Sequence, residues 1–362
     1  MKHCIATLFL LTTLLFAGSA LAQAAQNRAA SGGPLVLKAV IPLPGARGRM
    51  DHMSVDLKGK RVFASDVGNG SVYVVDTASD KVVHILTGFG EPQGNYFYQN
   101  RLYVDSGDDG TVKIFNGTNF KLLATAKFTI DADDARFDPK TKTVIVGYSG
   151  QKFFDGKPHK GPGGEGDGAL GYVKPNGDHG ALLSVDAHPE AFEIENNGAR
   201  VFINVPDHHE IEVGNLVTHR ILARWHVPCT GNFDMALDQA DHRLFSVCRK
   251  APTFLVFDTQ TGKLVQSIPI PSIGVSDDMY YDAARRRIYV LGADGYIQVM
   301  AQKDANHYTR LARVRERNGG HTALFVPAWN ELFVAVSQHA QLRPPMPYGS
   351  KRPPVMLVFK VQ

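Results

Sequence analysis

A four-strand unit of about 40 residues recurs along the chain, and this repeat constrains the fold more than any other feature. Its clearest copy lies at 53–88, where the runs MSVDL, RVFASDV, SVYVVDT and KVVHILTG follow one another. Each run is rich in Val, Ile, Phe and Tyr and is bounded by Gly, Asn, Asp or Lys, which is the pattern of a β-strand between turns. Four such strands in a row predict one blade of a β-propeller.

The repeat count predicts a closed ring. Five further four-strand copies follow the first, and the last copy supplies only the runs HTALFVP, ELFVAVSQ and VMLVFKV. The segment LVLKAVIPL at 35–43 precedes the first unit and can provide the missing strand. This pairing leaves no long unpaired sheet edge. We therefore predict an all-β fold, a seven-bladed β-propeller closed by an N-terminal strand that joins the last blade, with six or eight blades as the alternative.

The N-terminus has the pattern of a cleaved secretory signal over residues 1–22, since Lys2 precedes an apolar run that ends in Ala20-Leu21-Ala22. We expect a flexible mature N-terminus at 23–34 and one propeller domain over 35–362. No later stretch reaches the roughly 18 consecutive apolar residues of a membrane span. These features predict a periplasmic or secreted protein without a membrane span.

The charge of the chain is modest. The formal net charge is +4, and removal of Lys2 with the leader leaves +3. This balance gives no electrostatic basis for an extended nucleic-acid partner. We expect a monomer whose partner is a small-molecule ligand or an envelope protein.

Two cysteines remain outside the leader, Cys229 and Cys248. In an oxidising compartment this number predicts a disulfide, with two unpaired buried thiols as the alternative. The first precedes the opening strand of blade five and the second ends the next strand, so both are expected near one face of one blade. A bond there closes about 20 residues and stabilises the fold by roughly 3 kcal/mol.

Polar side chains stand at the start of the first strand of every predicted blade. Those strands line the central channel of a propeller, so the seven starts converge around its axis. The set comprises Asp51 and His52, Gln93 and Asn95, Asp133 and Asp134, His188 and Glu190, Asn232 and Asp234, Asp277 and Asp278, and His321. Turn capping and a wet channel wall are the alternative roles for each member.

This polar mouth predicts a bound cation, because crowded carboxylates repel one another unless a cation or shared protons neutralise them. The mixture of oxygen and imidazole donors leaves calcium, magnesium and zinc open. His52 and His321 are the candidate catalytic residues, as general bases. The candidate metal ligands are Asp134, Glu190, Asp234 and Asp278. The candidate ligand-binding residues are Asp51, Asn95, His188, Asn232, Asp277, Arg343 and Tyr348.

Two insertions, 151–167 and 339–354, interrupt the turn between the second and third strands of blades three and seven. We expect both to open on the face of the polar mouth. The first is Gly-rich, and the second contains five prolines with Arg343 and Tyr348. Long loops of this kind are either functional or solvated decoration. The motif DHHE at 207–210 is interpreted as an exposed hairpin tip, because adjacent side chains of a strand diverge.

The stretch RVFASDVGNGSVYVVDTASDKVV at 61–83 resembles a repeat of the YVTN β-propeller family, which reads close to V-Y-V-T-N, a short turn and a strand ending in I-D-T. The likeness in strand pattern covers about 37 to 362. The signature letters are clear in blades one and five, where FASD and FSVC replace the family tetrad. The resemblance implies a propeller, and members of the family have no single activity.

Two functions stay open at this point. The first is a small ligand or metal bound at the polar mouth of the channel, in a metal-dependent hydrolase or lyase. The second is a non-catalytic module of the cell envelope that binds a protein or a glycan. The sequence leaves turnover undecided.

Overall fold

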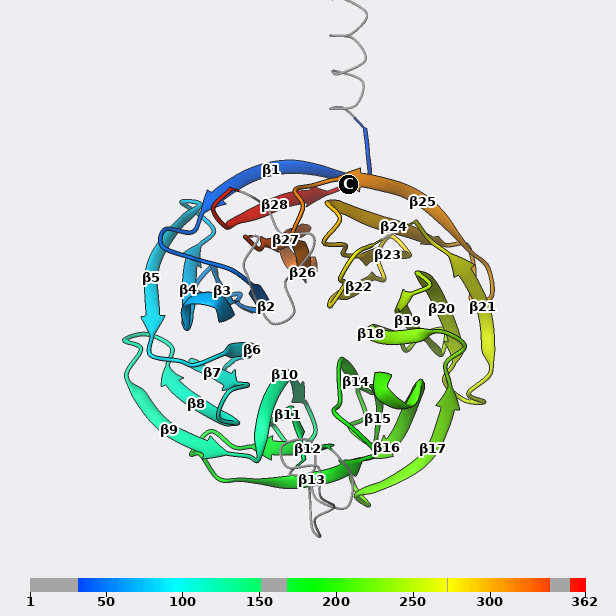
Figure 1. Ribbon diagram of the computed structural model, residues 1–362, viewed down its shortest axis with the longest axis horizontal. Coiled ribbons are helices and arrows are strands. Elements are labelled where there is room, and N and C mark those ends of the chain that lie inside the picture. The colour runs from blue at the N-terminus through cyan, green and yellow to red at the C-terminus, as the bar shows by residue number, and fades with distance from the viewer. Residues whose placement is uncertain (1–31, 151–167, 272, 339–351) are drawn as a thin grey trace, which may run out of the picture.

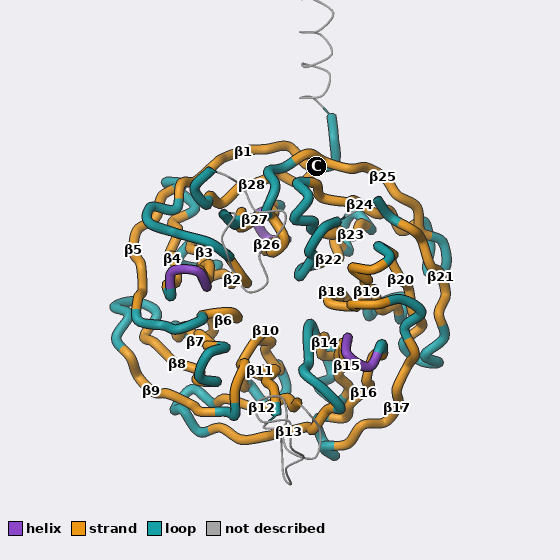
Figure 2. Tube along the Cα trace, in the orientation of Figure 1, coloured by secondary structure: helices purple, strands orange, loops and turns teal. Residues whose placement is uncertain are grey.

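The computed structural model of the chain describes residues 32–150, 168–271, 273–338 and 352–362. These residues form seven four-stranded antiparallel sheets that stand radially around one axis, as Figure 1 shows. The predicted seven-bladed propeller is confirmed. Helix is confined, within the described ranges, to three short 3₁₀ turns (Figure 2). These turns are η1 (Val67–Asn69), η2 (Pro206–His208) and η3 (Pro327–Trp329).

The first four blades follow one another along the chain, each built from the axis outward. Blade one comprises β2 (Met50–Asp56), β3 (Arg61–Asp66), β4 (Ser71–Asp76) and β5 (Lys81–Thr87); blade two β6 (Pro92–Tyr98), β7 (Arg101–Ser106), β8 (Thr111–Asn116) and β9 (Leu122–Lys127); blade three β10 (Ile130–Asp138), β11 (Thr143–Ser149), β12 (Gly168–Val173) and β13 (His179–Val185); blade four β14 (Phe192–Ile194), β15 (Arg200–Val205), β16 (Glu210–Asn215) and β17 (Arg220–His226).

The last three blades complete the ring. Blade five comprises β18 (Thr230–Asp238), β19 (Arg243–Lys250), β20 (Thr253–Asp258) and β21 (Leu264–Pro269); blade six β22 (Met279–Asp282), β23 (Arg287–Val290), β24 (Tyr296–Gln302) and β25 (Tyr308–Arg315); blade seven β26 (Gly320–Val326), β27 (Glu331–Val336), β28 (Val355–Val361) and β1 (Leu35–Pro42).

Ring closure joins the two ends of the sequence in one sheet. Strand β1 pairs antiparallel with β28, in a register that runs from Leu35 opposite Val361 to Pro42 opposite Val355. Figure 1 shows β1 as the outermost strand of this blade, alongside β28. The predicted closure by the N-terminal strand is therefore observed. It pairs the β28 edge that a three-stranded last blade leaves open.

Burial along each strand reflects its distance from the axis. The middle strands are covered on both faces by neighbouring blades, so β27 (Glu331–Val336) is buried throughout. The outermost strands contact solvent on one face, and β17 (Arg220–His226) accordingly alternates between exposed and half-buried residues. Apolar side chains fill the wedges between blades. In the wedge between blades seven and one, Ile41, Tyr73, Phe333 and Met356 belong to one buried cluster.

The predicted disulfide between Cys229 and Cys248 is present, with the two Cα atoms 6.0 Å apart. Cys229 immediately precedes β18, and Cys248 lies in β19, so the bond ties the loop entering blade five to that blade. A structural disulfide fits an oxidising compartment. Among the described residues, no helix has the length and apolar character needed to cross a membrane.

Candidate functional site

The innermost strands lie around the axis of the ring, as Figure 1 shows, and the region around this axis is called the channel below. These strands are β2, β6, β10, β14, β18, β22 and β26. The pairing register slips at the start of β2, between Met50 and Met53, where the β2–β3 ladder is irregular. Similar slips occur at the starts of β6, β10, β18 and β26. Such irregularities break the strict alternation of side chains and re-aim them. This explains why the adjacent residues Asp51 and His52 both contact groups of other blades around the channel.

His52 connects three blades through its imidazole ring. Its Nδ1 atom lies 3.3 Å from Oδ1 of Asp278 in blade six, and its Nε2 atom lies 3.7 Å from Oδ1 of Asp133 in blade three. The same Nε2 atom lies 3.9 Å from Oδ1 of Asp51. Burial lowers the pKa of His52, but Asp278, Asp51 and Asp134 outweigh it, so that the net pKa lies well above the ordinary value. The ring is therefore a cation at neutral pH.

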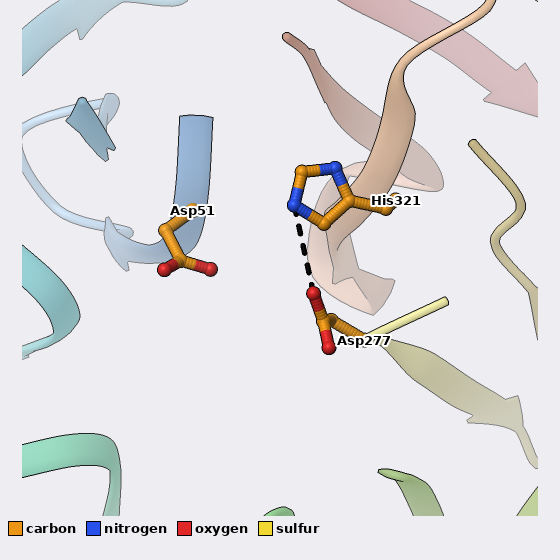
Figure 3. Close-up of side chains that lie close together, drawn as sticks. All are labelled: Asp51, Asp277 and His321. Atoms are coloured by element: carbon orange, nitrogen blue, oxygen red, sulfur yellow. Dashed lines mark ion pairs between the residues drawn. The ribbon is translucent and has the colours of Figure 1, made fainter. Parts of the chain in front are cut away.

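A first cluster of metal-competent groups consists of Asp51, Asp277 and His321, drawn in Figure 3. One ligand atom of each lies within 4.8 Å of the others. Nε2 of His321 is 3.5 Å from Oδ2 of Asp277. The side chains of Asp51 and His321 are almost completely buried, and that of Asp277 is 15% exposed. The cluster thus joins blades one, six and seven within a largely dehydrated space.

The tautomer of His321 follows from its hydrogen bond. Nδ1 lies 3.2 Å from the carbonyl oxygen of Gly319, and because a carbonyl only accepts, Nδ1 carries the proton. Burial lowers the pKa of His321, ahead of the opposing effect of Asp277, so the ring is neutral and Nε2 holds a lone pair. That atom is buried and has no hydrogen-bond partner among the described residues. Burial raises the pKa of the neighbouring Asp51 to about 7, while Asp277 is ionised. A lone pair beside these two carboxyl groups is unfavourable unless a proton or a cation lies between them.

A second cluster consists of Asp133, His188 and Glu190, whose ligand atoms also lie within 4.8 Å of one another. His188 Nε2 is 4.0 Å from Oε1 of Glu190, and its Nδ1 is 2.7 Å from the hydroxyl of Ser149. Burial raises the pKa of Asp133, and it raises that of Glu190 well above the ordinary value, with Asp133 adding to the effect. Both carboxyls therefore hold protons more firmly than in water.

Two arginines provide positive charge at the channel. Nη1 of Arg49 lies 3.0 Å from Oδ2 of Asp51, and its guanidinium also donates to Oε1 of Gln93. Arg249 forms an ion pair with Asp277 and stacks on Phe233, with 3.2 Å from its guanidinium carbon to the ring centroid. Burial raises the pKa of Asp277, but Arg249, His321 and His52 reverse this and hold it below the ordinary value. Asp277 is therefore a carboxylate.

Three of the four predicted metal ligands have other partners. Asp134 forms an ion pair with Arg136, and Asp278 accepts from the backbone N–H of Ala323 at 2.8 Å as well as contacting His52. Asp234 accepts from the hydroxyl of Ser276, and burial raises its pKa to about 8. None of these three carboxylates belongs to a metal-competent group among the residues described, whereas the fourth predicted ligand does, in the second cluster. Their role as metal ligands stays a prediction.

The amides of Asn95 and Asn232 link blades. Nδ2 of Asn95 in blade two donates to the carbonyl of His52 at 2.8 Å, and its Oδ1 accepts from Ser54 in blade one. Nδ2 of Asn232 in blade five donates at 3.0 Å to Oδ1 of Asn204 in blade four. Their side chains are buried, so these bonds support blade packing, and their predicted contact with a ligand stays untested.

Some groups at the site were missed by the sequence analysis, which considered only the starts of the innermost strands. Arg249 and Asp105 lie at the ends of second strands, where no sequence pattern marks them. Both carboxylate oxygens of Asp105 are buried without a hydrogen-bond partner among described residues, and burial, then Asp133, raises its pKa well above the ordinary value. Arg49 directly precedes the Met-Asp-His stretch, so its place beside the strand start was a usable signal.

The insertions fall where expected, since 151–167 separates β11 from β12 and 339–354 separates β27 from β28. Residues 151–167 and 339–351, with Arg343 and Tyr348, lie outside the described residues. The predicted ligand contacts of these two side chains therefore stay predictions.

Fold and site together define a class: a seven-bladed β-propeller with histidines and carboxylates gathered at the starts of its innermost strands. Comparison of the chain with protein-family models and with curated proteins finds no match.

Proposed function

We propose that the protein binds a divalent cation through Asp51, Asp277 and His321, and a small anionic ligand beside it, at the polar end of the channel. The observation that carries this proposal is the buried Nε2 lone pair of His321, which lies 3.5 Å from one carboxylate and has no donor in the part of the chain that the structure describes. A cation between these groups removes the repulsion and gains three ligands.

The ligand atoms of the first cluster narrow the choice of metal ion. One imidazole nitrogen with two carboxylates suits Zn²⁺, because Ca²⁺ and Mg²⁺ are held mainly by oxygen. We therefore place the cation at the first cluster, Asp51, Asp277 and His321. The predicted ligand Glu190 lies in the second cluster instead. Arg49 and Arg249 support an anionic ligand. Their side chains remain 26% and 19% exposed, and guanidinium groups bind carboxylate or phosphate through paired N–H donors.

The residues around the cluster support a metal-dependent hydrolase or lyase as the enzyme class. A bound cation would supply polarisation of a carbonyl oxygen. His52 is cationic and partly exposed, so it is suited to donate a proton to a leaving group rather than to act as the base. The strand pattern supports kinship with YVTN repeat propellers, and the disulfide supports a periplasmic or secreted location.

Metal analysis of the purified protein tests the cation site. We expect about one equivalent of Zn²⁺ at the channel and a lower melting temperature after chelation, which Zn²⁺ restores by mass action. His321→Gln and Asp277→Asn should remove the channel equivalent of Zn²⁺ and the part of this response that it causes. The matched control is the exposed pair on the outer part of blade six, changed as His307→Gln and Asp304→Asn, since these side chains are 73% and 58% exposed.

The outcomes separate the candidate functions. A wild-type protein whose melting temperature is identical with and without Zn²⁺ rules out the channel site. A protein that binds Zn²⁺ but turns over no ester, lactone or β-eliminating carboxylate is instead the non-catalytic envelope module.

A further inference from the structure

A third group of metal-competent side chains lies in blade four and its approach loop, apart from the groups that line the channel. It consists of Asp186 in the loop between β13 and β14, His208 in η2 and Glu210 in β16, with ligand atoms within 4.8 Å of one another. We propose that these three residues, together with Glu212, form a second site for a divalent transition-metal cation. This proposal is independent of the channel site.

Arg224 marks the place where the cation would be held. Its Nε atom lies 2.7 Å from Oδ2 of Asp186, 3.5 Å from Oε1 of Glu212 and 4.0 Å from Oε1 of Glu210. Three carboxylates therefore point at one position. The Arg224 side chain is 46% exposed and belongs to the outermost strand β17, so it is able to swing into solvent when a cation takes that position.

The hydrogen bonds of Arg224 leave oxygens of the two glutamates in this cluster without a donor in the described part of the chain. Arg224 donates to both oxygens of Asp186, at 2.7 and 3.0 Å, and to neither glutamate. Oε1 of Glu210 and Oε2 of Glu212 are buried without any hydrogen-bond partner among the described residues. Glu212 is completely buried, and its Oε1 accepts from the backbone N–H of Asp186, which holds the side chain against the cluster.

The charges of the cluster favour a divalent ion. Asp186, Glu210 and Glu212 carry three negative charges when ionised, and Arg224 supplies one positive charge. When Arg224 turns into solvent, a divalent cation in its place supplies two positive charges at a position that all three carboxylates face.

The donor chemistry selects the metal. Nδ1 of His208 lies 3.7 Å from Oε1 of Glu210, so an imidazole nitrogen is available beside the carboxylates. His208 is 44% exposed and stands at the rim, which gives a cation a path from solvent. An imidazole with carboxylates favours Zn²⁺ or Mn²⁺ over Ca²⁺. The motif at 207–210, read in the sequence as an exposed tip, thus places His208 and Glu210 in one site.

The test measures Zn²⁺ binding by equilibrium dialysis in a chain that carries Asp277→Asn and His321→Gln, so that loss of the channel site does not affect the result. We expect one equivalent of Zn²⁺ to remain bound. His208→Ala should weaken it roughly tenfold or more, as removal of a metal ligand or its support does. Glu212→Gln should weaken it similarly while keeping the volume of the buried side chain. His307→Ala, which removes an exposed imidazole beside Asp304, should leave it unchanged.

Arg224→Gln gives a result that a purely structural role does not produce. Removal of the competing guanidinium should tighten Zn²⁺ binding by about tenfold, even where the variant melts at a lower temperature. The proposal is overturned if the doubly substituted chain binds no Zn²⁺, or if His208→Ala and Glu212→Gln bind it as tightly as their parent. Failure of the channel proposal instead shows as equal Zn²⁺ binding with and without the channel substitutions.

Discussion

Nδ1 of His52 in blade one lies 3.3 Å from Oδ1 of Asp278 in blade six, and the ring places blade seven between them. The contact therefore joins blades that are not adjacent. It forms only when β1 pairs with β28 and the ring is closed. The ionisable site at the channel thus depends on the same strand pairing that completes the fold.

Loss of the His52 cation should destabilise the protein in a pH-dependent manner. Its pKa in the folded protein is raised, so its contribution is fully present below the unfolded pKa of about 6.5 and is lost as pH rises through the folded value. His52→Gln should cost about 3 kcal/mol near the unfolded pKa, and the difference should shrink in alkaline solution. Urea unfolding across this pH range measures it. The control His307→Gln removes a side chain that is 73% exposed and should change stability by less than about 1 kcal/mol. Equal stability of His52→Gln and wild type at every pH contradicts the prediction.

Ring closure should depend on one face of β1. Ile41 is 1% exposed and belongs to the cluster between blades seven and one, whereas its neighbour Val40 is 44% exposed. Ile41→Ala should lower the free energy of unfolding by about 2–4 kcal/mol, because it leaves a cavity. Val40→Ala on the same strand should cost less than about 1 kcal/mol. Denaturant titration compares the free energies of unfolding of the two variants. A loss for Ile41→Ala as small as that for Val40→Ala would mean that the buried face of β1 contributes little through packing.

The Cys229–Cys248 bond should stabilise the protein by roughly 3 kcal/mol, because it closes a loop with a sequence separation of 19 and so lowers the conformational entropy of the unfolded chain. The double variant Cys229→Ser, Cys248→Ser should melt at a lower temperature than wild type. Dithiothreitol should reduce wild-type stability to the level of the variant and leave the variant unchanged. An unaltered wild-type melting temperature after complete reduction argues against a stabilising role.

Asp66 should make stability fall as pH rises. Burial raises its pKa to about 7 from an ordinary 3.8, so the folded state binds the proton more tightly than the unfolded state between these values. The stabilisation is complete below the unfolded pKa and is lost through the folded one. The free energy of unfolding of Asp66→Asn should therefore exceed that of wild type by on the order of 2–4 kcal/mol at alkaline pH, and this difference should vanish in acid.

A second aspartate in blade one supplies the control for that measurement. Hydrogen bonds from the Ser79 hydroxyl and backbone N–H lower the pKa of Asp76, so its contribution is present above the unfolded pKa and is lost in acid. Asp76→Asn should thus change stability in the opposite sense to Asp66→Asn at neutral pH. Chemical denaturation of both variants at matched pH values checks the two signs together, and a shared sign would contradict the assignment.

Much of the architecture was readable because strand signals are local. Alternation and turn residues such as those at 61–83 define each strand within a few residues, and the three-strand last copy required a partner from Leu35–Pro42. The positions of the polar side chains at strand starts were predictable for the same reason, since topology alone directs the innermost strands to the axis.

The strand order, the seven-bladed ring and the polar residues at the starts of the innermost strands follow from the amino-acid sequence alone. Packing in three dimensions sets which polar groups contact one another. At the channel, Asp51, Asp277 and His321 form one cluster and Asp134 pairs with Arg136. In blade four, Arg224 lies among three carboxylates. Contacts between blades depend on strand irregularities, ring radius and burial, which arise from the packing of distant segments. The pKa of a carboxyl depends on that burial too, so its chemistry is fixed only when the ring is closed.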